Sequence, residues 1–96
     1  MKINFYKNNG ILSVALDGRL DTTTAPELES FIGNNYDGKD LIVIDCKKLS
    51  YISSAGLRVL LTAQKKTKGA MKLINVCEEV MEVFEMTGFA DILVIE

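Results

Sequence analysis

Residues 41–44, Leu-Ile-Val-Ile, constrain the fold of this 96-residue chain more than any other segment. An uninterrupted apolar run rich in β-branched residues is typical of a strand that is covered on both faces. Strands of this kind belong to parallel sheets, in which neighbouring strands are joined by long, usually helical crossovers. The run therefore predicts an α/β domain. A chain of this length has room for one such domain with one modest core.

The segments on either side of this run predict the element order ββαβαβαβ. The other strands are expected at residues 2–6, 11–16, 71–76 and 92–95, and the helices at about 24–33, 54–67 and 78–87. Asn9-Gly10, a two-residue hairpin signal, joins the first two strands. Strands separated by helices imply right-handed crossovers. We expect a mixed, mostly parallel sheet of about five strands, with helices packed mainly on one face, in a single domain of residues 1–96.

Apolar spacing also predicts which side chains form the core. The expected core residues are Leu28, Phe31, Val43, Leu57, Leu60, Leu61, Leu73, Val83 and Phe84. Thr24 and Glu27 have the spacing of a capping box, which predicts the start of the first helix. Residues 47–53 are expected to form a loop between the central strand and the second helix.

The composition excludes most catalytic and cofactor sites. The chain has no histidine and no metal-ligand spacing, so it lacks a Ser-His pair and a metal set. A Ser-Lys hydrolase acting through Ser54 is the remaining enzymatic alternative, but the lysines crowd helix ends and surface positions. The net charge of −2 argues against nucleic acid, because nucleic-acid modules carry a basic excess on one face. We therefore expect no enzymatic activity, no cofactor, no metal and no nucleic-acid partner.

The cysteines and the apolar stretches indicate a cellular compartment. Cys46 and Cys77 lie in or beside apolar strand-like runs, which is typical of buried free thiols in a reducing environment; a disulfide is the alternative. Met1 leads into an alternating segment, not into the apolar run of a signal peptide. The longest apolar stretches are far shorter than a membrane span. We expect a cytoplasmic protein without membrane insertion.

Residues 49–61, Leu-Ser-Tyr-Ile-Ser-Ser-Ala-Gly-Leu-Arg-Val-Leu-Leu, place two serines at the start of an amphipathic helix. Capping by Ser53 or Ser54 is a sufficient explanation, since a serine there accepts hydrogen bonds from free amides of the first turn. A helix start is also favourable for an anion, so a phosphate attached there would be tolerated by the fold. Ala55 and Gly56 are small, which would let another protein approach closely.

Three segments together resemble the STAS family, the domain shared by bacterial anti-sigma-factor antagonists and the cytoplasmic tails of sulfate transporters. They are Gly18-Arg19-Leu20-Asp21, Leu41 to Asp45, and Tyr51 to Leu61. The resemblance covers essentially the whole chain, with the segments in the family's order and spacing. It implies a STAS-like fold. The transporter-tail alternative is disfavoured, because no transmembrane part is expected.

In the antagonist branch, the resemblance implies a protein that binds an anti-sigma factor and so frees the sigma factor. That anti-sigma factor is also a serine kinase, which phosphorylates the signature serine and ends binding; a phosphatase restores it. Alignment through Gly56-Leu57 places this serine at Ser54. The best-known antagonists carry Asp directly before the acceptor, where this chain has Ser53, and often Ser or Thr after it, where this chain has Ala55. Ser53 is therefore the alternative acceptor.

The residues expected to face the partner are Asp21, Ser53, Ser54, Ala55, Gly56, Arg58 and Thr62. For Asp21 the alternative is a role as a cap or turn residue. Arg58 and Thr62 lie opposite the apolar face of the second helix, and simple solvation would also explain them. The alternative function is a non-phosphorylated STAS scaffold or polarity component that acts through the same surface.

Overall fold

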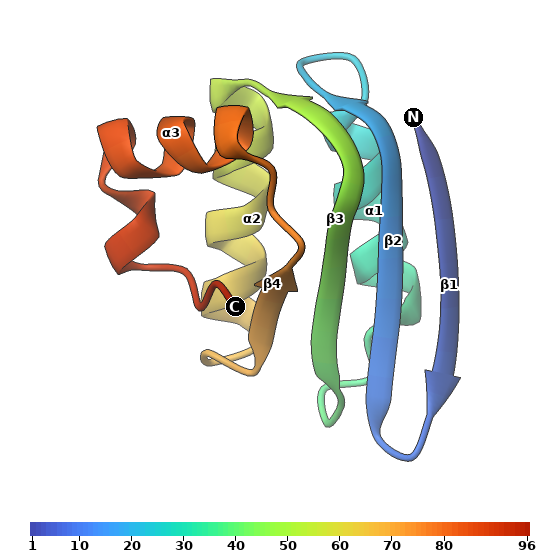
Figure 1. The fold of residues 1–96 in the computed structure, drawn as a ribbon. Coiled ribbons are helices and arrows are strands. Elements are labelled where there is room, and N and C mark those ends of the chain that lie inside the picture. The colour runs from blue at the N-terminus through green and yellow to red at the C-terminus, as the bar shows by residue number, and fades with distance from the viewer.

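The computed structural model describes residues 1–96, which form one sheet and three α-helices (Figure 1). The strands are β1 (Lys2–Asn8), β2 (Ile11–Leu20), β3 (Leu41–Ile52) and β4 (Met71–Ile74). The helices are α1 (Ala25–Asn35), α2 (Ser54–Lys66), α3 (Glu78–Thr87) and the short 3-10 helix η1 (Phe89–Asp91). The three predicted helices are confirmed.

The sheet has the order β1-β2-β3-β4, with an antiparallel β1–β2 pair and parallel β2–β3 and β3–β4 pairs. The opening hairpin turns through Asn9 and Gly10, whose φ values of 51° and 78° are those that an Asn-Gly turn requires. This confirms the prediction of a mixed, mostly parallel sheet.

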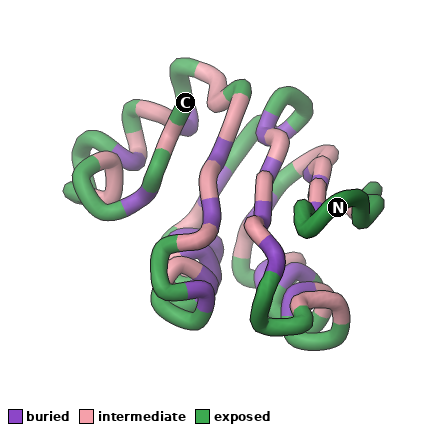
Figure 2. Tube along the Cα trace, turned by 90° about the horizontal axis from the view of Figure 1, so that it is seen from below, coloured by how far each residue is buried: buried purple, intermediate pink, exposed green.

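Helices α1 and α2 lie side by side on one face of the sheet, and α3 lies on the β4 side (Figures 1 and 2). The strands turn alternate residues toward α1 and α2, and these inward residues are buried. They are Leu12, Val14 and Leu16 on β2, Ile42, Ile44 and Cys46 on β3, and Met71 and Leu73 on β4. The opposite face of the sheet carries no helix.

Five of the nine predicted core residues are buried, and the other four are only half-buried. Leu28, Leu57, Leu60, Leu73 and Phe84 are buried, whereas Phe31, Val43, Leu61 and Val83 are only half-buried. Val43 points to the uncovered face of the sheet, because its neighbours Ile42 and Ile44 point inward. Phe31 lies at the rim of α1, where its ring meets that of Phe5 edge-on at a centroid distance of 4.7 Å.

Two expectations about the strands are wrong. The loop expected at 47–53 is mostly strand, because β3 continues to Ile52 and pairs with the end of β2, where Leu20 lies opposite Ile52. The strand expected at 92–95 is absent. Gly88, in the left-handed region at φ 82°, ends α3, and η1 follows, so only Ile95 reaches the sheet, in a single bridge to Leu73. The sheet therefore has four strands, not five.

Both cysteines are free thiols in the structure. Cys46 is buried in β3, and this burial raises its pKa to about 12. Cys77 is half-buried at the start of α3. No helix combines the length and the apolar character needed to cross a membrane.

Candidate functional site

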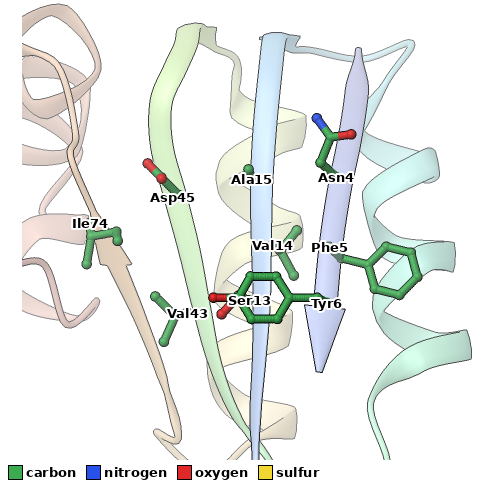
Figure 3. Close-up of a pocket in the computed structure, with 9 residues that line it drawn as sticks. All are labelled: Asn4, Phe5, Tyr6, Ser13, Val14, Ala15, Val43, Asp45 and Ile74. Atoms are coloured by element: carbon green, nitrogen blue, oxygen red, sulfur yellow. The ribbon is translucent and has the colours of Figure 1, made fainter. Parts of the chain in front are cut away.

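The uncovered face of the sheet holds a hollow of about 330 Å³ (Figure 3). Its lining includes the ring of Tyr6, the side chains of Val43 and Ile74, and the carboxylate of Asp45. That carboxylate already accepts hydrogen bonds from the Asn75 amide group and the Lys47 backbone amide, both at 3.0 Å. The hollow is therefore a shallow, mostly apolar surface on which no reactive groups converge.

The other candidate is the edge of the sheet where β2 and β3 end and α1 and α2 begin. In parallel strands the carboxyl ends meet at one edge, so the helices that follow them start close together. The backbone amide of Ser53 donates to the carbonyl of Leu20 at 2.9 Å, which joins the two strand ends. Asp21, which follows β2, and Ser53 and Ser54, which follow β3, lie at this edge.

The two serines of this edge have different roles. Ser53 is the N-cap of α2: its backbone is extended, and its hydroxyl accepts a hydrogen bond from the Gly56 amide at 3.4 Å. Ser54 is the first residue of the helix and is exposed. No side-chain hydrogen bond in the structure uses its hydroxyl. The structure thus resolves which serine caps the helix and leaves the other hydroxyl accessible.

Gly56 is buried and offers little surface to a partner, so its place on the partner-facing surface stays a prediction. A Cβ atom there would lie 2.8 Å from both Cγ and the carbonyl oxygen of Leu20, and 2.9 Å from Cγ1 of Ile52. The glycine is needed because α2 approaches the ends of β2 and β3 this closely. Ala55, beside it, is half-buried and does reach the surface.

Asp21 caps the turn that leads into α1, which confirms its interpretation as a cap or turn residue. Its Oδ1 accepts hydrogen bonds from the amides of Thr23 at 3.0 Å and Thr24 at 3.1 Å. The Thr24 amide is the main cause that lowers the pKa of Asp21, with Arg19 a minor one. The capping box expected at Thr24 and Glu27 is not formed, because the backbone of the N-cap residue Thr24 is in the helical region and its side chain makes no cap hydrogen bond. Its hydroxyl instead donates to the Arg19 carbonyl at 2.7 Å.

Arg19 was not predicted as a site residue, yet it lies beside Asp21. Its Nε is 3.7 Å from Oδ2 of Asp21, and its guanidinium carbon stands 4.0 Å above the centre of the Tyr51 ring. The signal for this contact is the strand register, which pairs Arg19 with Tyr51. The contact between Arg19 and Tyr51 was missed because Tyr51 was expected in a loop, whereas it belongs to β3.

A groove of about 190 Å³ lies between α1 and α2, and Ala55, the residue after Ser54, is part of its lining. Ala55, Arg58 and Thr62 line its α2 side, so the structure brings these predicted residues together. Thr22, Pro26 and Glu29 contribute from the α1 side and were not predicted. They could have been found from the parallel arrangement alone, since it places the two helix starts side by side.

Comparison with known proteins is consistent with this arrangement. The model of the STAS domain family matches residues 2–96. BtrV of Bordetella bronchiseptica, named as an anti-sigma factor antagonist, is 38% identical over 96% of this chain and 83% of its own length. The anti-sigma-B factor antagonist of Bacillus subtilis is 31% identical over 97% of this chain and 88% of its own.

Solved structures of low sequence identity share the fold. An anti-sigma factor antagonist from Mycobacterium paratuberculosis superposes with a TM-score of 0.86 at 23% identity, covering 98% of this chain and 83% of that one. The Bacillus cell fate determinant SpoIIAA in its phosphorylated form superposes with a TM-score of 0.73 at 17% identity, covering 99% and 91%.

Proposed function

This chain belongs to the STAS domain family, and we propose that it is an anti-sigma factor antagonist, which frees a sigma factor by binding the anti-sigma factor that holds it. Relatives that match almost the whole chain carry that name. The observation that carries the proposal is the exposed hydroxyl of Ser54, which begins α2 and takes part in no side-chain hydrogen bond. We place the protein in the cytoplasm, where such partners act.

The partner in this proposal is an anti-sigma factor that is also a serine kinase, and Ser54 is the residue it phosphorylates. Ser54 is favoured over Ser53 because the Ser53 hydroxyl is half-buried and engaged with the Gly56 amide. A kinase needs a hydroxyl that can enter its own active site, and Ser54 offers one. A phosphatase acting on phospho-Ser54 returns the protein to its binding form.

A phosphate on Ser54 is compatible with the fold. It adds about −1.5 to −2 charges at pH 7 and three acceptor oxygens. The first amides of a helix have no partner within the helix, and the positive end of the helix dipole lies there. The effect on stability should therefore be small or favourable. SpoIIAA, a chain of the same fold, exists in a phosphorylated form, which supports this point.

The same phosphate would oppose binding. Ser54 and Ala55 form a small, uncharged patch against which a partner can pack closely. A phosphate would clash there and would have to lose its water without gaining a matched cation from the partner. A loss of about 3 kcal/mol corresponds to roughly a hundredfold in affinity. Asp21, Arg58 and Thr62 flank the patch and would belong to the same contact surface.

Binding to the kinase-type anti-sigma factor of the same organism, in the presence of its sigma factor, tests this function. The unmodified chain is expected to displace the sigma factor, and Ser54→Ala should do so equally well. Ser54→Asp should bind more weakly, because it carries part of the charge of a phosphate. If no form of the chain displaces the sigma factor, the antagonist function is wrong. If all forms bind alike and none is modified, the non-phosphorylated scaffold replaces it.

A further inference from the structure

Arg58 lies four residues after Ser54 on α2, and both residues are exposed. Residues at this spacing are neighbours on the helix surface, with Cβ atoms about 5–6 Å apart. Long side chains on a helix tend to lean toward its N-terminus, so the guanidinium of Arg58 is within reach of a group attached to Ser54. An acidic group preceding a basic one by four residues is also the favourable order along a helix.

The guanidinium of Arg58 has no partner in the fold. None of the ion pairs and side-chain hydrogen bonds of the structure uses it. The other arginine of the chain, Arg19, is already engaged with Asp21 and Tyr51. The lysines of α2, Lys65 and Lys66, lie in its last turn, roughly 16–18 Å along the helix axis from Ser54. Arg58 is thus the free cation within one turn of Ser54 on α2.

We propose that Arg58 is the internal counter-ion of a phosphate on Ser54, paired with it across one turn of α2. This rests on the proposed function, since it requires a phosphate at that residue. A planar guanidinium can give two parallel hydrogen bonds to phosphate oxygens, which a lysine cannot do.

The pair would also change the groove between α1 and α2. In the unmodified chain Arg58 lines this groove together with Glu29 of α1. A phosphate on Ser54 draws the guanidinium toward the start of α2 and leaves Glu29 without a nearby cation on the opposite wall. Phosphorylation then alters the partner-facing surface in two ways, by adding negative charge at Ser54 and by withdrawing positive charge from the groove.

The test uses the full chain with phosphoserine installed at position 54 by genetic encoding, so that no kinase is needed. The second pKa of the phosphate is measured by phosphorus NMR at low salt. A nearby cation favours the dianion and lowers this pKa. Arg58→Gln is therefore expected to raise it, by roughly 0.15–0.4 pH units. Arg58→Lys should raise the phosphate pKa less, because the positive charge remains and only the two parallel hydrogen bonds of the guanidinium are lost.

Lys66→Gln is the matched control, because it removes one positive charge from the far end of the same helix. It should leave the phosphate pKa nearly unchanged. Equal shifts for Arg58→Gln and Lys66→Gln, or no shift for either, would overturn the pairing. The result does not depend on a kinase. If the pairing is correct but the proposed function is not, the pKa shift appears while the native chain is never modified at Ser54.

Discussion

The starts of α1 and α2 lie at the same edge of the sheet, each directly after a strand, but they are held in different ways (Figure 1). At the start of α1 the side chains of Asp21 and Thr24 are engaged: Asp21 accepts from two backbone amides, and the Thr24 hydroxyl donates to the Arg19 carbonyl. At the start of α2 there is one long cap bond from Ser53, and the Ser54 hydroxyl is free.

This difference separates a structural helix start from one that is available for chemistry. The hydrogen bonds of Asp21 and Thr24 fix the turn before α1. The start of α2 is fixed instead by backbone bonds and by packing around Gly56, which allows its first side chain to face solvent unused. If this comparison is right, α2 should be sensitive to changes in its packing and insensitive to changes in its first hydroxyl.

The largest effect is expected at the buried face of α2. Leu60 is 1% exposed, and Leu60→Ala should lower the free energy of unfolding by about 2–5 kcal/mol, because it removes buried methyl groups and leaves a cavity. Urea unfolding followed by circular dichroism measures this. Thr62→Ala, on the exposed side of the same helix, should change it by less than about 0.5 kcal/mol. If Leu60→Ala also lowers the free energy of unfolding by less than about 0.5 kcal/mol, packing does not fix α2.

The next largest effect is expected at Gly56. Gly56→Ala would place a methyl group 2.8 Å from Leu20 atoms, so the helix start must shift. Overpacking of this kind costs about 1–3 kcal/mol in the free energy of unfolding. Gly33→Ala is the matched control, since Gly33 is also helical but a Cβ atom added there would meet no other atom within 4 Å. It should be neutral or stabilising, and equal losses at both glycines would contradict the close approach.

A smaller and pH-dependent effect is expected at Asp21. The amide hydrogen bonds hold the folded pKa of this carboxyl below its usual value of 3.8, so the unfolded chain binds more protons between the two values. The stabilisation is complete above that usual value and is lost as pH falls through the lowered folded pKa. Asp21→Ala should therefore lower the urea midpoint at about pH 6 and have less effect at about pH 2.

Asp21→Asn keeps an acceptor for the two amides and serves as the control for the turn itself. Asp37, whose pKa is lowered mainly by the Lys39 amide, contributes to the same pH window in every variant. The difference in urea midpoint between wild type and Asp21→Ala should therefore shrink at low pH. Both proteins should keep the pH dependence that Asp37 contributes. A pH-independent difference would show that the Asp21 charge plays no part.

The smallest effects are expected at the two serines. Ser53→Ala removes a cap whose hydrogen bond is long, 3.4 Å, so the loss should lie near the lower end of the usual range, about 0.5–1 kcal/mol. Ser54→Ala should change the free energy of unfolding by less than about 0.5 kcal/mol, because its hydroxyl has no bond to lose. A reversed order would show that Ser54 is the structural serine.

Much of the fold could be predicted from the sequence because apolar spacing is a local signal. The run Leu41–Ile44, the Asn9-Gly10 turn and the three amphipathic helices predicted the mixed sheet and its helical layer. The extension of β3 to Ile52 could not be predicted in this way, because it depends on pairing with β2, a partner distant in the sequence. The last strand was wrong for a different reason: the apolar segment 92–95 is present, but after η1 it runs as a turn and irregular chain, and only Ile95 forms a bridge to the sheet.

The positions of the candidate site residues could be predicted in outline, and their role in binding a partner stays a prediction. Ser54 and the residues Ala55, Arg58 and Thr62 lie where the helical spacing placed them. Gly56 was assigned to the surface because it is small, whereas its size is needed by contacts with Leu20 that no local pattern reveals. Arg19 was missed for the same reason, since its contact with Tyr51 depends on strand register.

Mass spectrometry of the chain after incubation with ATP and the kinase-type anti-sigma factor proposed as its partner tests most directly whether Ser54 is the switch. Wild type and Ser53→Ala should each carry one phosphate, on Ser54, and Ser54→Ala should carry none. The modified wild type should also lose roughly a hundredfold in affinity for the kinase. A phosphate on Ser53, or no phosphate with a kinase that modifies its other substrates, would contradict the assignment of Ser54.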